Sequence, residues 1–195
     1  MTRTLVVVTH PSPEGLARQA LVRVLAGLER RGDDVEVIDL DAEAFDPRLT
    51  LDEKRRHLDP PDTKPWVADH TAALQRAERL ILVYPTWWGG FPARLKGWFD
   101  RTWITGVAYT LPEGSTRIHA GLKNIKRLEI VTTHGSSRLA NTLQGNAGKL
   151  IAFRTLRLLC HPLCRRRFHA FYSAGSANPD QVATWLDGLE ETFAR

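Results

Sequence analysis

The residues best suited to chemistry gather in three short segments, and the first runs from His10 to Leu16 (HPSPEGL). It joins an apolar run to a stretch with helical periodicity, and the free amides and positive end of a helix N-terminus favour phosphate. Ser12 offers a hydroxyl, Gly15 permits close approach of the backbone, and Arg18 can add positive charge. Neither G-x-G-x-x-G nor G-K-S/T is present. The segment can therefore be interpreted either as a phosphate site or as a plain strand-to-helix turn.

The second segment, Tyr84 to Pro92 (YPTWWGGFP), places two adjacent tryptophans beside two glycines. Because neighbouring residues on a connection point in different directions, one of Trp87 and Trp88 can pack inward while the other lines a cleft. The backbone near Gly89 can approach a flat heteroaromatic ring and hydrogen-bond its edge. The alternative is that both tryptophans belong to the core, as aromatic residues usually do. Core packing alone does not explain two glycines at the end of a strand.

The third segment, Thr132 to Ser137 (TTHGSS), is small and polar and contains one histidine. A neutral His134 imidazole can donate one hydrogen bond, and its charged form can stabilise a nearby anion. A helix cap or a surface residue is the alternative for a lone histidine at this place. Together the three segments indicate a phosphate end, an aromatic platform and a polar rim. This set suits a phosphorylated planar cofactor, and flavin mononucleotide (FMN) fits better than a bare nucleotide.

Alternating strands and helices must position these segments. Short apolar, β-branched runs predict strands, and apolar residues at helical spacing predict helices. The strands are expected at Thr4–Thr9, Val35–Leu40, Arg79–Tyr84, Arg127–Thr133 and Arg167–Ser173, and the helices at Glu14–Arg31, Pro65–Ala77, Pro92–Thr102, Leu139–Leu159 and Pro179–Phe193. Phe45–Lys64 is expected to be irregular and Val107–Lys123 mostly loop. The alternation predicts an α/β protein, a doubly wound parallel sheet with helices on both faces and its ligand site beyond the carboxyl ends of the strands.

Composition fits one globular domain spanning residues 1–195. The chain is 43% hydrophobic and 25% charged, which excludes a disordered protein. Its apolar runs are too short to insert in a membrane, and its N-terminus does not resemble a signal peptide. Two cysteines, Cys160 and Cys164, exclude a disulfide framework and favour a reducing cytoplasm. The net charge of +5 permits attraction to anions but does not indicate nucleic acid.

Three stretches resemble the NAD(P)H:quinone oxidoreductase (DT-diaphorase-like) family, whose members have a flavodoxin-like fold. The first is Thr9-His10-Pro11, which follows the first strand. The second runs from Tyr84 to Arg101 (YPTWWGGFPARLKGWFDR) and is long and specific. The third is Val131 to Gly135 (VTTHG). The resemblance extends in the right order through nearly the whole chain and becomes loose after Lys149.

The resemblance implies a five-stranded parallel sheet of order 2-1-3-4-5 and a tightly held flavin, FMN or FAD. It also implies a homodimer in which the partner completes each active site. Carried over by position, His10 and the amides of Gly15 and Leu16 would hold the phosphate. The other two segments would surround the ring: Pro85, Thr86, Trp87, Trp88 and Gly89 along the isoalloxazine edge, and Thr132, Thr133, His134 and Gly135 beside its pyrimidine side and the ribityl chain.

The sequence departs from the family pattern at two places. Family members commonly have a serine where Gly15 stands, so a hydroxyl is missing here, and Glu14 adds a negative charge beside the expected phosphate. Ser12 is the candidate to compensate. The mammalian quinone reductases also have a tyrosine and a histidine shortly after the third segment, whereas residues 138–148 contain neither. His134 is therefore the nearest candidate to support charge on a reduced flavin.

Other features receive structural interpretations. Cys160 and Cys164 have no second Cys/His pair to complete a zinc site, so no metal is expected. Asp39 lacks the glycine fingerprint that accompanies a ribose-binding acid and is interpreted as a strand-end residue. The run Arg165–Arg167 is interpreted first as a solvated surface, with the 2′-phosphate of NADPH as a second option and nucleic acid as a remote third.

The leading hypothesis is a flavin-dependent NAD(P)H oxidoreductase. Hydride would pass from nicotinamide to flavin, and a quinone or similar electron-poor acceptor would then stack at the same place, which predicts ping-pong kinetics. His134 would help to stabilise the reduced flavin, and Trp88 would shape the stacking pocket. One alternative is a non-enzymatic flavin module, either an electron carrier or a regulatory subunit docked on a transporter. Another is a protein that has lost the cofactor.

Overall fold

The computed structural model describes residues 1–195 and contains a five-stranded parallel sheet. The strands lie in the order β2-β1-β3-β6-β7, and each pairs in parallel with its neighbours. They are β1 (Arg3–Val8), β2 (Asp34–Asp39), β3 (Arg79–Pro85), β6 (Arg127–Thr133) and β7 (Arg165–Phe171). The α/β class and the predicted order 2-1-3-4-5 are confirmed. The last strand begins at Arg165, two residues earlier than expected.

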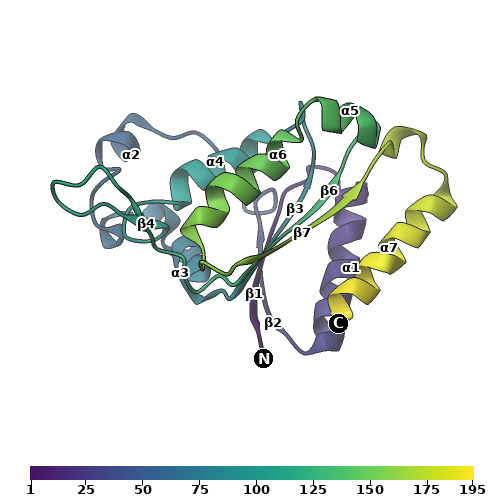
Figure 1. The fold of residues 1–195 in the computed structure, drawn as a ribbon, viewed down its shortest axis with the longest axis horizontal. Helices are drawn as coiled ribbons and strands as arrows, with labels where there is room; N and C mark the ends of the chain where they lie inside the picture. Colours follow the sequence, from purple (N-terminus) through teal and green to yellow (C-terminus); the bar gives the residue numbers. More distant parts are fainter.

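Helices cover both faces of the sheet (Figure 1). They are α1 (Leu16–Arg31) and α7 (Pro179–Ala194) on one face, and α3 (Ala68–Arg76), α4 (Ala93–Thr102) and α6 (Ala147–Leu150) on the other. Under α1 and α7 lies a core of branched side chains that includes Val6, Ile81 and Val131. Under the second layer lies a larger core around Leu82 and Trp98. Coverage on both faces explains the continuous apolar runs Leu5–Val8 in β1 and Leu80–Tyr84 in β3. No helix combines the length and the apolar character needed to cross a bilayer.

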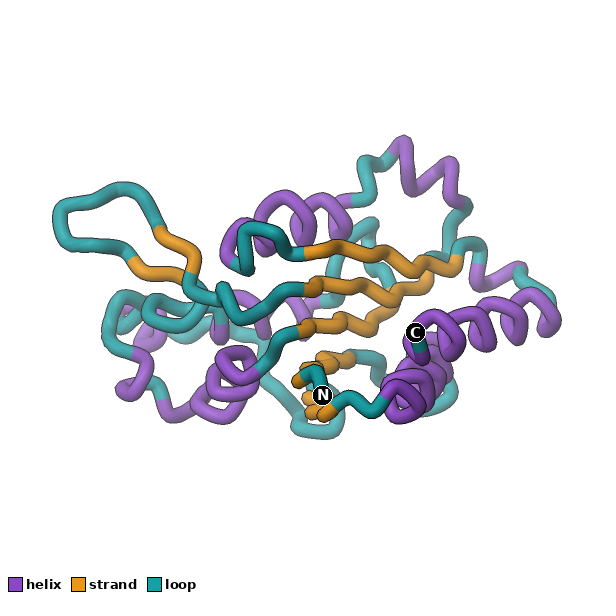
Figure 2. Tube along the Cα trace, turned by 60° about the horizontal axis from the view of Figure 1, so that its bottom comes forward, coloured by secondary structure: helices purple, strands orange, loops and turns teal.

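Two segments expected to be irregular or looped contain short regular elements. Within Phe45–Lys64, Thr50 and Glu53 form a reciprocal capping box that starts a short helix. Within Val107–Lys123, two short strands form a hairpin that stands away from the main sheet (Figure 2). These elements are α2 (Leu51–Arg55), β4 (Tyr109–Thr110) and β5 (His119–Ala120).

The long helix expected over Leu139–Leu159 is broken. Gly145 and Asn146 have φ angles of 84° and 46°, and this left-handed backbone separates α5 (Arg138–Leu143) from α6. After α6 the chain continues as a π turn and a 3-10 turn to Leu159. The break leaves α5 beyond the carboxyl ends of the strands, at the top of Figure 1, next to the predicted site.

Candidate functional site

The sheet brings the three predicted segments to one edge. They follow β1, β3 and β6, which are neighbours in the sheet. The Thr9 amide donates to the Val83 carbonyl (3.1 Å) and the Thr86 amide to the Thr133 carbonyl (2.8 Å), so the pairing continues into the segments. The hydroxyls of Thr86 and Thr132 lie 3.0 Å apart and join the second segment to the third. This is the usual ligand position in doubly wound folds.

The tryptophan pair lies on a two-residue turn. Trp87 and Gly90 exchange two backbone hydrogen bonds (3.2 and 2.9 Å), and Trp88 and Gly89 between them have φ angles of 47° and 73°. These features define a type I′ turn, in which left-handed backbone at a bulky residue costs about 1–3 kcal/mol. Trp88 is 100% exposed and Trp87 59% exposed. The expectation that one of them packs inward is wrong, as is the alternative that both are core, because the turn holds both at the surface.

His134 is nearly buried, with 5% of its surface exposed. Its amide donates to the Phe171 carbonyl (2.7 Å), and its ring stacks on Tyr172 with 4.7 Å between the ring centroids. Burial lowers the pKa of His134, and the nearby Asn141 side chain opposes this only in part, so the ring is neutral at pH 7. Neither Nδ1 nor Nε2 has a hydrogen-bond partner. This buried, unsatisfied ring is neither a helix cap nor a surface residue.

A cavity of about 340 Å³ lies between the second and third segments. Its lining residues are Thr86, Trp88 and Gly89 from the second segment, His134, Gly135 and Ser136 from the third, and Asn141, Gln144 and Ala147 from the α5–α6 region. The volume lies near the lower end of the range for ligand pockets. His134 lines the cavity with a ring whose unpaired nitrogens are themselves buried, and Trp88 gives the cavity an aromatic border. These residues fit a flat heteroaromatic group such as the flavin ring.

The cavity contains only some of the residues predicted for the ring site. Pro85, Trp87, Thr132 and Thr133 adjoin it in the sequence but do not line it. Four lining residues were not predicted: Ser136, Asn141, Gln144 and Ala147. The spacing of three between Asn141 and Gln144 is that of residues on one helix face. The Asn141 amide donates to Ser136 Oγ (2.8 Å) and to the Ser137 carbonyl (2.9 Å), and so orders the third segment. The Gly145-Asn146 pair, whose residue types commonly end helices, is the signal in the sequence that could have revealed the break after α5.

The first segment leads into the N-terminus of α1, whose N-cap Gly15 supplies no side-chain bond. The amides of Leu16 and Ala17 donate to no backbone carbonyl, which leaves two donors free for a phosphate. The segment does not line the cavity between the other two. Its own cavity, of about 610 Å³, includes the carboxylates of Asp39 and Asp41 and is therefore unsuited to an anion.

The glycine at position 15 is required by the ring of His10. A Cβ atom on Gly15 would lie 2.0 Å from His10 Cε1 and 2.2 Å from Nε2. The Ser12 amide donates to His10 Nδ1 (3.0 Å), so the proton of a neutral ring lies on Nε2. A neutral His10 ring thus places an N–H beside Gly15, close to the N-terminus of α1.

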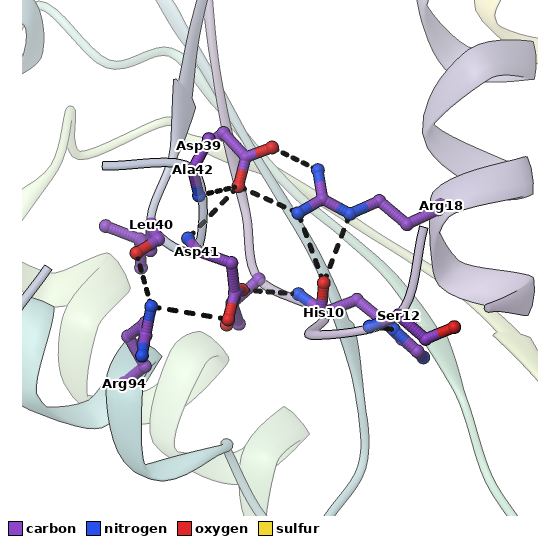
Figure 3. Close-up of polar contacts among 9 residues, drawn as sticks. His10, Ser12, Arg18, Asp39, Leu40, Asp41, Ala42 and Arg94 are labelled. Carbon is purple, nitrogen blue, oxygen red and sulfur yellow. Dashed lines mark hydrogen bonds and ion pairs between the residues drawn. The ribbon is translucent and has the colours of Figure 1, made fainter. Parts of the chain in front are cut away.

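Arg18 holds the first segment in place instead of facing a phosphate (Figure 3). Its guanidinium forms an ion pair with Asp39, and its Nη2 donates to the His10 carbonyl (3.1 Å). Asp41 accepts hydrogen bonds from the Thr9 hydroxyl and the His10 amide, each 2.7 Å long. Burial raises the pKa of Asp39, but Arg18 and two backbone amides outweigh this and hold it below its usual value. Asp39 therefore acts as a structural acid at the end of β2.

Known proteins share this fold over the whole chain. The family model described as the flavodoxin-like fold matches residues 2–191. The chain is also similar to NAD(P)H dehydrogenase (quinone) 1 of Cavia porcellus, with 27% identity over 155 residues. That match covers 71% of this chain and 56% of the relative, so the chain spans little more than half the length of this curated relative.

Two solved structures resemble it from end to end. One is the NAD(P)H:quinone oxidoreductase from Methanothermobacter marburgensis, with a TM-score of 0.82, 24% identity, and coverage of 100% of this chain and 98% of that one. The other is the FMN-dependent NADH-azoreductase from Bacillus anthracis, solved with FMN, with a TM-score of 0.75, 16% identity, and coverage of 100% and 99%. At these sequence identities, the similarity to the two solved structures shows that the fold is shared.

A doubly wound parallel sheet with a ligand cavity at its carboxyl edge defines the class of protein, which is flavodoxin-like. The chain belongs to the flavodoxin-like family. Its match to the guinea pig protein confirms the resemblance to the NAD(P)H:quinone oxidoreductases.

Proposed function

We propose that this chain is a flavin-dependent NAD(P)H oxidoreductase that reduces a quinone or a similar electron-poor acceptor. The observation that carries the proposal is the cavity lined by both a neutral, unpaired His134 and the exposed Trp88. The names of a curated relative and of two structural neighbours support it. When bound, the flavin supplies the redox chemistry, since it can accept hydride from a nicotinamide and pass two electrons on.

The residues of the chain hold and polarise this cofactor. The imidazole of His10 and the amides of Gly15, Leu16 and Ala17 are the proposed phosphate donors, of which the last two are free. Thr86, Gly89 and Gly135 border the ring, while Pro85, Trp87, Thr132 and Thr133 complete the strand ends behind it. A cavity of about 340 Å³ favours FMN over FAD, because it leaves little space for an adenine.

Two residues have proposed catalytic roles. His134 is neutral and can donate one hydrogen bond to a ring atom that gains negative charge. Trp88 presents an aromatic face on which nicotinamide or acceptor can stack. Ser12, which is exposed and accepts the Gly15 amide through its carbonyl (3.2 Å), shapes the turn before α1.

The proposed working unit is a homodimer. Trp87 and Trp88 together present two exposed indoles beside the cavity, and contiguous apolar surface of this kind marks interaction sites. A second copy would cover them and close the mouth of the cavity. A reducing cytoplasm stays a prediction, and the unpaired, buried Cys160 and Cys164 are consistent with it.

Steady-state oxidation of NADH and NADPH by the purified chain, with menadione as acceptor, tests the proposed activity. We expect acceptor-dependent turnover with ping-pong kinetics, because donor and acceptor use one place. A yellow protein that turns over no quinone would contradict the enzyme and support the electron-carrier alternative.

A further inference from the structure

A second cavity, of about 510 Å³, lies at the opposite edge of the sheet and has an unusual lining. None of its eight lining residues is hydrophobic and six are arginines: Arg31, Arg79, Arg127, Arg165, Arg167 and Arg195, together with Glu129 and Thr192. Strands of about seven residues place it roughly 20 Å from the carboxyl edge. It is therefore separate from the cavity that contains His134.

Sheet register creates this concentration of charge. Arg79, Arg127 and Arg165 are direct partners on β3, β6 and β7, so the three side chains project from one face of the sheet. That face is the one under α7, because the Arg79 guanidinium lies 4.9 Å from the centroid of the Phe193 ring. Arg167, two residues along β7, points the same way.

The basic run of β7 is thus divided between the two faces of the sheet. Arg166 points to the other face, where its guanidinium lies 5.7 Å from the Phe153 ring and donates to the Phe153 carbonyl (3.3 Å). All three arginines of the run are exposed, as the solvated-surface interpretation predicts, but they do not share one face of the sheet. Two of its members enter a cavity, and one lies outside it.

Carboxylates do not balance this charge. Glu129 binds Arg79 at Nε (3.0 Å) and Nη2 (2.9 Å), and Asp33 pairs with Arg31. Arg79 is 1% exposed, yet its Nη1 has no hydrogen-bond partner and lies 3.7 Å from the nearest Asp33 oxygen. The other four arginines of the cavity form no ion pair within 4.0 Å. Like charges directly opposite on neighbouring strands destabilise a sheet, so an anion bound among these arginines would stabilise it.

We propose that this cavity binds a compact polyanion with at least two phosphoryl groups. The bidentate forks of several arginines suit phosphoryl oxygens. Arg79 Nη1 provides a buried donor at the base, and the arginines of β6 and β7 surround it. The absence of hydrophobic lining argues against recognition of a nucleobase or an acyl chain, so the phosphoryl groups carry the affinity. The site is independent of the proposed redox function.

Calorimetric titration of the purified full chain with inorganic triphosphate at low salt tests this site. We expect triphosphate to bind at least about tenfold more tightly than sulfate, and ATP to bind no more tightly than triphosphate. Arg165→Gln/Arg167→Gln should weaken triphosphate at least about tenfold. Arg166→Gln, between them on the opposite face, is the matched control and should bind like the wild type.

Several results would overturn the proposal. These are equal affinity for triphosphate and sulfate, unchanged affinity in the double variant, or tighter binding of a hexaglutamate peptide, which would indicate an acidic protein partner. Without ligand, the double variant should melt no lower than the wild type, because repulsion is relieved. Should it fail to fold, Arg127→Gln provides the same comparison, and unchanged affinity there would equally reject the site.

Discussion

Trp88 and His134 occupy positions that do not favour folding. Trp88 leaves its entire side chain in water on left-handed backbone, and His134 buries two unpaired nitrogens. Each feature costs about 1–3 kcal/mol. Strain and unsatisfied polar groups of this kind concentrate at ligand sites. We therefore interpret both residues as parts of a binding site and not of the scaffold.

Replacing Trp88 should separate stability from function. Trp88→Gly removes the strain at φ 47° and should raise the free energy of unfolding by about 1 kcal/mol. The same change, or Trp88→Ala, should lower flavin retention and turnover about fivefold, because an aromatic face is lost. Urea unfolding and steady-state kinetics measure the two effects. Leu163→Ala, an exposed apolar residue away from the cavity, is the control. Unchanged retention and turnover would show that the platform is misplaced.

His134 should make stability depend on pH. Its pKa is lowered by burial below the ordinary value of 6.5, so the unfolded chain binds more protons just below that pH. Its contribution is full above about pH 6.5 and is lost as the pH falls toward its lowered pKa. Urea unfolding at pH 7.5 and 5.5 should show a smaller loss in His134→Gln than in the wild type. The exposed His119→Gln variant should lose as much stability as the wild type. An equal loss of stability in the wild type and in both variants would reject the role given to His134.

At the scale of elements, the strands were predictable and the breaks between helices were not. Runs such as Thr4–Thr9 are buried on both faces and carry their signal locally. The break at Gly145–Asn146 depends on left-handed backbone, which the Gly-Asn pair permits but which the spacing of apolar residues does not reveal. The capping box of Thr50 and Glu53 was visible in the sequence but lay in a segment without clear periodicity. Local pattern thus predicts the buried elements better than their connections.

The same difference holds for the candidate site. The three segments were predictable because each follows a buried strand, and the structure brings them to one edge of the sheet. The outward position of Trp87 was not predictable, because the hydrophobic pattern of the sequence does not reveal a type I′ turn that contains a tryptophan. Gly15 also has a packing role that the sequence did not suggest. Its backbone is not left-handed, with φ −60°, and its small size makes room for the His10 ring.

The connection between β1 and α1 yields a coupled prediction. Gly15→Ala should displace the His10 ring, because a Cβ atom would overlap it. Flavin affinity should then fall about as much as in His10→Ala, and the double variant should fall no further. Fluorescence titration with FMN measures all three. Losses that add in the double variant would show that the two residues act independently.

At the scale of the whole molecule, the two edges of the sheet carry opposite kinds of site. The carboxyl edge has a neutral cavity with aromatic and histidine borders, whereas the amino edge has a cavity dominated by arginine. The modest net charge of +5 is therefore unevenly distributed. Such separation would allow two chemically different ligands to bind one small domain without competing.

A homodimer is the prediction at this scale. Light scattering coupled to size-exclusion chromatography should give twice the mass of the chain, because a dimer would bury the exposed indoles. Trp87→Ala/Trp88→Ala should shift the mass toward that of one chain. A monomer at micromolar concentration in the wild type would contradict the dimer while leaving the fold and the cavity unaffected.

The visible spectrum of the freshly purified protein, with mass analysis of the released chromophore, tests the central claim most directly. We predict a yellow protein that carries FMN in stoichiometric amount, or that takes it up on addition. A colourless protein that binds neither FMN nor FAD from excess would contradict the claim that the carboxyl edge of this sheet is a flavin site.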